Sequence, residues 1–351
     1  MTANLLSAGT DGSIHIFDLD ATAKKNDKLV VSSISRLQGA HKFAISGVNW
    51  FPGDTGMFTT GSMDATIKVW DTNALENRVL SHAFSPIGTV PCLFTFEGKR
   101  AHIVTTSIAT SHTLLACGLA EPRVRLCDLR TGGSVQALTG HQASVFSVKF
   151  SPINEWLLVS GGADKSIRFW DIRKARACVL ALDLNNSDRT TPNYLGEVDV
   201  IAHDGLVNGL CFTSNGKHLI STAHDERIRL WDVSTGRNTL TNYGPNLHNR
   251  AAIETCPVVT PINMCHPPLI YHPSDHRQVL VFDMMTGALV KRLRGHFGRV
   301  NCVELRSEFQ ELYSGGNDHE ILIWAPPEKD EQPLFPEAHQ ATADAWSDDE
   351  R

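Results

Sequence analysis

The sequence predicts an all-β protein, a seven-bladed β-propeller, and two repeated features carry this prediction. The first is a dipeptide of an aromatic or thiol residue followed, in every copy but the last, by Asp. The second is a polar residue, Asp in five copies of seven, six positions before each dipeptide. The dipeptides are Phe17-Asp18, Trp70-Asp71, Cys127-Asp128, Trp170-Asp171, Trp231-Asp232, Phe282-Asp283 and Trp324-Ala325. The upstream residues are Asp11, Asp64, Glu121, Asp164, Asp225, His276 and Asp318. Seven copies indicate seven blades.

Each copy belongs to a repeat typical of WD40 propellers, in which roughly 40–45 residues form one four-stranded blade. In the clearest repeat, Val145–Phe150, Trp156–Ser160 and Ser166–Trp170 are predicted to be the first three strands. Successive dipeptides lie 42 to 61 residues apart. Where this spacing exceeds the length of one repeat, the additional residues are expected in loops. We therefore expect one propeller domain over residues 1–326, with an insertion at about residues 87–106.

Segments at the two ends predict incomplete first and last blades. Leu5–Ala8 is expected to be the second strand of blade one, because Asp11 marks the turn and Phe17 closes the third strand. In blade seven the third strand ends at Trp324, and two prolines follow shortly after it. Seven blades of four strands would then lack two strands, which leaves 26 strands and an open seam between blades one and seven. Because propellers avoid such free edges, we expect the natural protein to begin upstream of Met1.

The composition excludes several classes of partner. No run of about 18 apolar residues occurs, so no membrane span is expected. Residues 328–351 hold eight acidic and two basic side chains, which account for the whole formal net charge of −6. The rest of the chain is neutral, which argues against nonspecific DNA binding, and a local basic patch on one face is the alternative. We expect no direct, sequence-specific binding of nucleic acid. Residues 327–351 are predicted to be an acidic, disordered tail. The scattered cysteines indicate a reduced, intracellular protein.

Ser or Thr recurs together with His, Asp and Trp in four repeats. The four sets are His41, Thr60, Asp64 and Trp70; His141, Ser160, Asp164 and Trp170; His203, Ser221, Asp225 and Trp231; and His296, Ser314, Asp318 and Trp324. A hydrolase triad uses the same polar residue types, but an active site is needed once and not four times. We interpret the sets as buried chains in which Asp accepts from His, His contacts the hydroxyl, and the hydroxyl contacts the indole N–H. No catalytic residue is predicted, and the protein is expected not to be an enzyme.

Residue types that bind zinc cluster in the sixth repeat. They are Cys256, Cys265, His266, His272 and His276. Their spacing matches no paired-ligand module, and His276 stands where most other repeats carry the turn Asp. A divergent blade with histidines in its loops is the alternative, and it is the one that we expect, with no metal and no cofactor.

Residues 158–173 combine the full blade signature with a final Trp170-Asp171-Ile172-Arg173. The third repeat ends in the weaker match Cys127-Asp128-Leu129-Arg130. Nine extended residues at about 3.3 Å each would carry the chain roughly 30 Å from Asp164 to Arg173, which would place Arg173 on the opposite face of the disc. There the guanidinium could fork onto carboxylates or carbonyls of a partner, with Asp171 and Trp170 holding the strand end. An ordinary surface arginine that caps a strand is the alternative, and the spacing does not decide between the two.

The segment at 158–173 resembles the box found in WD40 substrate receptors of cullin-4 ubiquitin ligases. The chain from about Leu5 to Ser347 resembles one group of these receptors, the Cockayne syndrome group A family. The segments that carry this resemblance are Trp50–Thr59, Ile67–Asn73, Val207–Ser214, Asn238–Leu240, Asn242–Gly244, Phe309–Gly315 and Asp344–Ser347. That family has an N-terminal helical segment that this chain lacks, and the stretch expected upstream of Met1 would supply it.

The resemblance implies a non-catalytic, nuclear substrate receptor that acts in transcription-coupled nucleotide excision repair. It implies that Arg173 contacts the propeller adaptor of the ligase, with Arg130 as a second candidate. Stalled RNA polymerase II and repair factors are the further partners that it implies. The alternative function is a WD40 scaffold in chromatin or transcription complexes without a ligase role.

Overall fold

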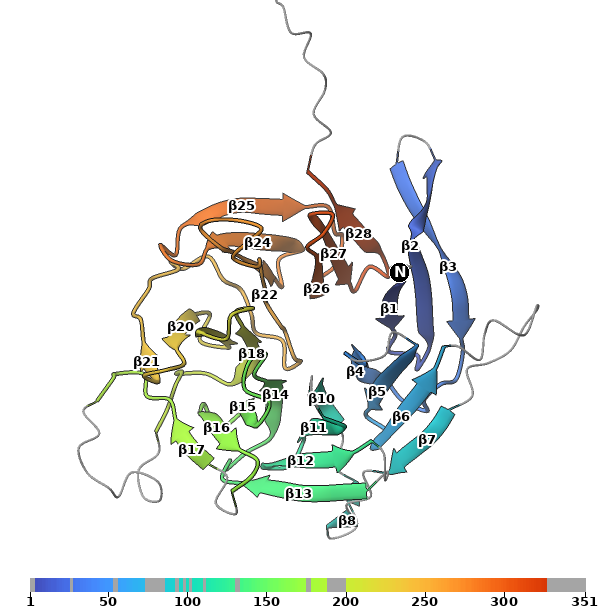
Figure 1. Cartoon of the computed structure of the whole chain (residues 1–351). Helices are drawn as coiled ribbons and strands as arrows, with labels where there is room; N and C mark the ends of the chain where they lie inside the picture. The colour runs from blue at the N-terminus through green and yellow to red at the C-terminus, as the bar shows by residue number, and fades with distance from the viewer. Residues whose placement is uncertain are drawn as a thin grey trace, which may run out of the picture.

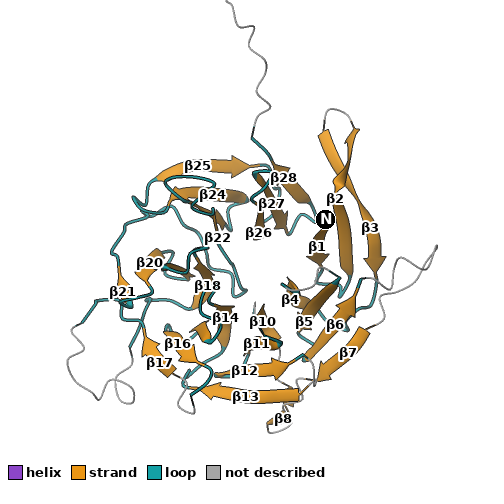
Figure 2. Ribbon diagram, viewed as in Figure 1, coloured by secondary structure: helices purple, strands orange, loops and turns teal. Residues whose placement is uncertain are grey.

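Seven β-sheets arranged in a ring make up the protein, which confirms the predicted seven-bladed propeller (Figure 1). The computed structural model describes residues 4–25, 28–52, 56–72, 86–91, 95–96, 99–100, 103–109, 112–129, 133–174, 178–187 and 200–326. The predicted tail at 327–351 and Arg130 lie outside the described residues. Strands and loops make up the described chain, and no helix in it is long and apolar enough to span a membrane (Figure 2).

The blades follow one another in chain order, and all their strand pairs are antiparallel. Blade one holds β1 (Asn4–Ala8), β2 (Ile14–Lys25) and β3 (Lys28–Leu37); blade two holds β4 (Ile45–Trp50), β5 (Met57–Ser62), β6 (Thr66–Asp71) and β7 (Pro86–Pro91). Blade three holds β10 (Ile103–Ile108), β11 (Leu114–Leu119), β12 (Arg123–Asp128) and β13 (Gly133–Thr139); blade four holds β14 (Val145–Phe150), β15 (Leu157–Gly162), β16 (Ile167–Asp171) and β17 (Cys178–Ala181). Blade five holds β18 (Val207–Phe212), β19 (His218–Ala223), β20 (Ile228–Asp232) and β21 (Arg237–Asn238); blade six holds β22 (Val258–Val259), β23 (Leu269–Pro273), β24 (Gln278–Asp283) and β25 (Leu289–Arg294). Blade seven holds β26 (Val300–Arg306), β27 (Glu311–Gly316) and β28 (Ile321–Trp324), and a separate hairpin is formed by β8 (Thr95–Phe96) and β9 (Lys99–Arg100).

Blade four shows how the alternation of the sequence produces this fold. Its first three strands, β14, β15 and β16, lie where the sequence predicts them, to within two residues at their ends. Leu158 of β15 lies opposite Trp170 of β16, and both pack in a core shared with blade three. Val159 and Phe169 point to the other face, where they pack with Val207 of blade five. Because a fully buried apolar side chain contributes about 1.5–3 kcal/mol, packing on both faces joins each blade to its neighbours.

Blades one and seven contain three strands each within the described chain, as the sequence predicts. The pairing of β1 with β2, which contains Phe17, places β1 at the second position of its blade. In blade seven, β28 contains Trp324 and has no outer strand beside it among the described residues. Apart from the hairpin, the described chain therefore has 26 blade strands, the number expected from the sequence.

The segment expected to be an insertion, residues 87–106, consists partly of regular blade strands. β7 is the outer strand of blade two, and β10 is the first strand of blade three. Only residues 92–102, which include the β8–β9 hairpin, lie between these two strands. The predicted boundaries were too wide, because neither strand contains the dipeptide by which a repeat is recognised.

Arg306 joins blade seven to blade one across the seam, where the two blades lie next to each other in Figure 1. Its guanidinium, at the end of β26, donates to Asp20 of β2 at 2.8 Å. Glu311 lies 3.6 Å from the same guanidinium, and the centre of the Phe309 ring lies 3.7 Å from it. The Arg306 side chain is only 14% exposed, whereas Asp20 is 46% exposed, so water screens the ion pair from one side. An ionic contact therefore contributes to ring closure at the seam.

Replacing Arg306 should loosen this seam. Arg306→Gln should lower the free energy of unfolding by about 0.5–1 kcal/mol, because it removes a charge-assisted hydrogen bond to the half-exposed Asp20 between the two blades. Asp20→Asn keeps the side-chain shape and removes the carboxylate charge, so it should reproduce part of the loss. In urea unfolding, the double variant should lose less than the sum of the single losses. Strict additivity would show that the contact does not contribute.

Candidate functional site

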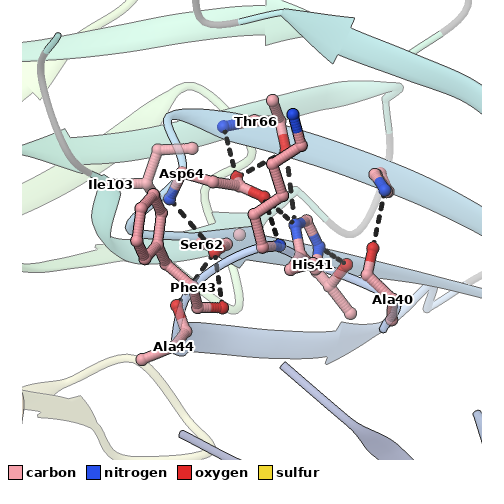
Figure 3. Close-up of polar contacts among 12 residues, drawn as sticks. Ala40, His41, Phe43, Ala44, Ser62, Asp64, Thr66 and Ile103 are labelled. Atoms are coloured by element: carbon pink, nitrogen blue, oxygen red, sulfur yellow. Dashed lines mark hydrogen bonds and ion pairs between the residues drawn. The ribbon is translucent and has the colours of Figure 1, made fainter. Parts of the chain in front are cut away.

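Four blades contain a polar chain, meaning an Asp, a His, a hydroxyl and an indole linked in that order. In blade two, His41 lies in the loop between β3 and β4, and its Nδ1 is 3.0 Å from Asp64 Oδ2 (Figure 3). Its Nε2 is 2.7 Å from Thr60 Oγ1, which also accepts a hydrogen bond from the Trp70 indole at 2.9 Å. The hydroxyl of Thr66 donates to the other oxygen of Asp64 at 2.6 Å. The chain thus links the loop that enters the blade to β5 and β6.

The same contacts occur in blades four, five and seven. The His–Asp distances are 2.8 Å for His141 and Asp164, 2.9 Å for His203 and Asp225, and 2.8 Å for His296 and Asp318. The distances from these histidines to the hydroxyls are 2.6 Å for Ser160, 2.7 Å for Ser221 and 2.7 Å for Ser314. The indoles of Trp170, Trp231 and Trp324 donate to these hydroxyls at 2.7, 2.8 and 2.8 Å. The structure therefore brings together every member of the four predicted sets.

The direction of each hydrogen bond follows from the residue types. A carboxylate only accepts, so Nδ1 of the histidine carries the proton toward Asp, and Nε2 of the neutral ring accepts from the hydroxyl. The hydroxyl oxygen in turn accepts from the indole N–H. A hydrolase triad has the same donor order, but Ser160 and Ser221 are fully buried, so no substrate reaches their Oγ atoms. The polar chains satisfy groups inside the blades.

Burial and hydrogen bonding shift the pKa values in these chains. Burial alone would raise the pKa of Asp164, but donors from His141, Ser166 and the backbone outweigh it and lower the pKa to about 2. In blade five, burial lowers the pKa of His203 below its usual range, against the opposing influence of Asp225. The pKa of Asp225 is also lowered, because the bond to His203 and the charges around it outweigh burial. At neutral pH Asp225 is ionised and His203 is neutral, as the donor order requires.

Blade six departs from this pattern, since His272 stands where four other blades have Ser or Thr in a polar chain. His272 is fully buried, and neither ring nitrogen has a partner among the described residues. Burial lowers its pKa to about 3, so the ring is neutral at physiological pH. At the turn, the His276 ring stacks on that of His248, with 3.9 Å between ring centres. Within the described chain, no group of three His, Cys, Asp or Glu side chains is placed to share a metal ion.

Arg173 follows β16, at the end of blade four opposite the Asp164 turn. Its Nε and Nη2 donate to the two carboxylate oxygens of Asp171, each at 3.0 Å. These bonds lower the pKa of Asp171 to about 2. The guanidinium also lies 5.7 Å from the centre of the Trp156 ring. The Arg173 side chain is 58% exposed, and its Nη1 has no partner among the described residues. Arg173 is therefore held in place with one edge of the guanidinium open to a partner.

Trp170, named with the predicted adaptor surface as a residue that holds the strand end, lies inside the blade. It is 1% exposed and its indole donates to Ser160, so it supports the strand and does not itself reach a partner. The chain from Asp164 to Arg173 is not extended throughout, contrary to the sequence estimate. β16 spans only Ile167–Asp171, and Lys165 adopts a left-handed turn conformation with φ 65°.

Two contributions to these sites were missed from the sequence. The hydroxyls of Ser166 and Thr66 donate to the turn Asp of their blades at 2.9 and 2.6 Å. Ser13 in blade one holds the same position, so a Ser or Thr two residues after the turn Asp would have indicated this contact. Trp156 comes beside Arg173 through the pairing of β15 with β16, and no sequence spacing indicates that neighbour.

Comparison with known proteins places the chain in a family. The model of the WD domain, G-beta repeat, matches residues 31–71, 132–171, 197–232 and 287–325, and these matches coincide with the four blades that contain polar chains. WD repeat-containing protein ATCSA-1 of Arabidopsis thaliana is 32% identical over 412 aligned positions, which cover 98% of this chain and 87% of the relative. The chain belongs to the WD-repeat family that includes ATCSA-1.

Two further proteins are similar to this chain at lower identity. Radiation-sensitive protein 28 of Saccharomyces cerevisiae is 28% identical over 207 positions, which cover 54% of this chain and 38% of the relative. A guanine nucleotide-binding protein subunit beta of Oryza sativa is 23% identical over 335 positions, which cover 88% of this chain and 80% of the relative. The similarity to ATCSA-1 extends along nearly the whole chain, whereas the similarity to the yeast protein covers about half of it.

Asp164→Ala tests the structural role of the polar chains. The change leaves His141, Ser166 and a backbone N–H without their acceptor, and each unsatisfied buried group costs about 1–3 kcal/mol. We expect a clearly lower melting temperature and a reduced cellular abundance. Asp204→Ala, at an exposed turn position in the next blade, is the matched control and should melt like the parent protein. A variant at Asp164 that folds normally but loses a hydrolytic activity would contradict the structural role.

Acid should weaken the same contact in a defined pH range. A carboxylate whose pKa is lowered by folding stabilises the protein fully above its unfolded pKa, and this contribution is lost as the pH falls toward the folded pKa. For Asp164 the range runs from about pH 4 to about pH 2, and the contribution is about 2 kcal/mol. Asp164→Asn should therefore be less stable than the parent at pH 5 in urea unfolding, and the difference should shrink toward pH 2. A difference that stays constant with pH would sink this assignment.

Proposed function

We propose that this protein is the substrate-receptor subunit of a cullin-4-type E3 ubiquitin ligase that acts in transcription-coupled nucleotide excision repair. The observation that carries the proposal is the exposed, oriented Arg173 at the end of the 158–173 segment, in a chain related to ATCSA-1 along its whole length. The role is non-catalytic: the propeller holds a substrate protein on the ligase, and other subunits perform the chemistry. No cofactor is needed for this role.

The geometry of Arg173 suits a contact with the propeller adaptor of the ligase. Asp171 fixes the guanidinium through two parallel hydrogen bonds, and Trp156 lies beside its plane. An arginine that is already oriented loses little side-chain entropy when a partner binds, which favours affinity. The Nη1 edge remains for a carbonyl or carboxylate of the adaptor. Arg130 belongs to the same proposal as a second contact, although it lies outside the described residues.

The repair context rests on the relatives. ATCSA-1 is similar along nearly the whole chain, and the name of the yeast relative refers to sensitivity to radiation. We propose that the protein works in the nucleus and that its partners include stalled RNA polymerase II and repair factors. The charge distribution agrees with contacts to proteins and not to nucleic acid, because residues 1–327 carry equal numbers of acidic and basic side chains.

Arg173→Ala should weaken binding of the cullin-4 adaptor by about tenfold or more if this residue is an interface hot spot. The exposed substitution should leave the melting temperature nearly unchanged. Lys174→Ala is the matched control: Lys174 is 61% exposed and also lies near Asp171, at 3.6 Å, but it makes no bidentate contact. Biolayer interferometry with purified adaptor measures both variants at equal folded concentration. Equal binding of parent and Arg173→Ala would overturn the assignment and favour a WD40 scaffold without a ligase role.

A further inference from the structure

The turns between the first two strands of blades three, four and five lie on the same face of the disc as Arg173. The register pairs Leu157, the first residue of β15, with Asp171, so the turn between β14 and β15 lies at the Arg173 end of blade four. The corresponding pairs in blades three and five place their turns at this end as well. The surface around Arg173 therefore includes three neighbouring turns.

Trp156 connects Arg173 to the turn of blade three. The centre of a Trp156 ring lies 5.7 Å from the guanidinium, and the centre of the His112 ring lies 5.1 Å from Trp156. The Nε2 of His112 also donates to the carbonyl of Glu155 at 2.9 Å. Blade three thus holds the end of the blade-four turn in place beside the arginine, before any partner binds.

The turn of blade four is also held by its own hydrogen bonds. The backbone N–H of Ser151 donates to the Leu157 carbonyl at 2.9 Å, and the N–H of Leu157 donates to the Asn154 carbonyl at 3.0 Å. The hydroxyl of the buried Ser151 accepts from the Asn154 N–H at 3.2 Å, and the Asn154 side chain accepts from the Trp156 N–H at 3.2 Å. A turn that is already ordered loses little conformational entropy when a partner covers it.

Ile153 lies in this rigid turn and is 68% exposed. One part of its side chain lies against the turn of blade five, because a Cβ added to Gly216 would be 3.1 Å from both Cγ1 and Cδ1 of Ile153. Gly216 also has a left-handed backbone with φ 61°, which favours glycine at this position. Within the described residues of the three turns, Ile153 is the one large apolar side chain that is mostly in water.

We propose that Ile153 is an apolar anchor of the adaptor-binding surface and enters an apolar pocket of the adaptor, next to the acceptor that Arg173 contacts. This inference rests on the proposed function. A stable interface covers about 800 Å² on each partner, so a contact at one arginine extends over the side chains around it. The centre of such an interface is apolar and its rim is polar. Ile153 suits the centre, whereas Lys174, which is charged and 61% exposed, suits the rim.

Blade six provides a matched control for this position. Pro261–Asn263 repeats the tripeptide of Pro152–Asn154 and lies in the equivalent turn, between β22 and β23. The N–H of Thr260 donates to the Leu269 carbonyl at 2.9 Å and closes this turn as in blade four. Ile262 is 42% exposed, and its turn lies at the same end of a blade two positions further along the ring. The same substitution at Ile262 therefore separates the position in the ring from the residue type.

Biolayer interferometry with the full chain and purified adaptor tests the proposal. Ile153→Asp should weaken binding by about tenfold or more, because it would place a carboxylate in an apolar pocket. Ile262→Asp introduces the same charge on the same face and should bind like the parent protein. Ile153→Leu keeps the apolar surface, so it should also bind nearly as the parent does. All three changes are at exposed positions and should leave the melting temperature nearly unchanged.

Arg173→Ala, measured beside these variants, separates this inference from the proposed function. If Arg173→Ala weakens binding and Ile153→Asp does not, the adaptor surface stands and Ile153 is not part of it. Equal losses for Ile153→Asp and Ile262→Asp would reduce the effect to added negative charge and overturn the anchor. If neither Arg173→Ala nor Ile153→Asp weakens binding, the proposed adaptor surface fails, and the anchor fails with it.

Discussion

The polar chains do more than satisfy buried groups, because each of them joins two blades. The histidine always comes from the connection that follows the outer strand of the preceding blade, whereas the hydroxyl and the indole lie on the second and third strands of the next blade. A bond from His141 to Ser160 therefore fixes the end of blade three to blade four. In the same way, His41, His203 and His296 link blades one to two, four to five and six to seven.

The three remaining joints use other contacts. Between blades two and three, the Asn49 carboxamide donates to the Thr106 hydroxyl at 2.7 Å. Between blades five and six, Asn208 and Asn249 exchange two hydrogen bonds of 2.8 Å and are almost fully buried. Arg306 and Asp20 connect blades seven and one. A joint without the polar chain leaves the preceding connection free to take another path. Blade five shows such a path, because its chain leaves β20 after Thr239 and forms a loop before β22 of blade six.

Repetition explains how much of this molecule could be predicted from the sequence. The fold and the polar chains each recur, so a spacing that is weak in one repeat becomes strong when four or seven repeats share it. The three-stranded first and last blades followed from the same count. The fork of Arg173 on Asp171 occurs once and depends on local backbone geometry, so no repeat indicated it. The left-handed turn at Lys165 does recur, at Gly12, Ala65, Glu226, Arg277 and His319, but these residue types differ and gave no common signal in the sequence. The unpaired His272 was missed as well, since its blade lacks the pattern that would have marked its position.

Under the proposed role of Arg173, blade four separates stability from recognition along a single strand. Asp164 and Asp171 lie beside the two ends of β16, and hydrogen bonds lower the pKa of both carboxylates to about 2. Asp164 accepts from groups inside the blade, so losing it acts on the free energy of unfolding. Asp171 orients an arginine that is 58% exposed, so losing that arginine acts on a surface contact alone. Domains are stable by about 5–15 kcal/mol, so a cost of about 1–3 kcal/mol leaves the folded state dominant but raises the unfolded fraction. Damage to a polar chain therefore lowers the amount of protein before it changes what the remaining protein binds, whereas under the proposed role of Arg173 damage there does the reverse.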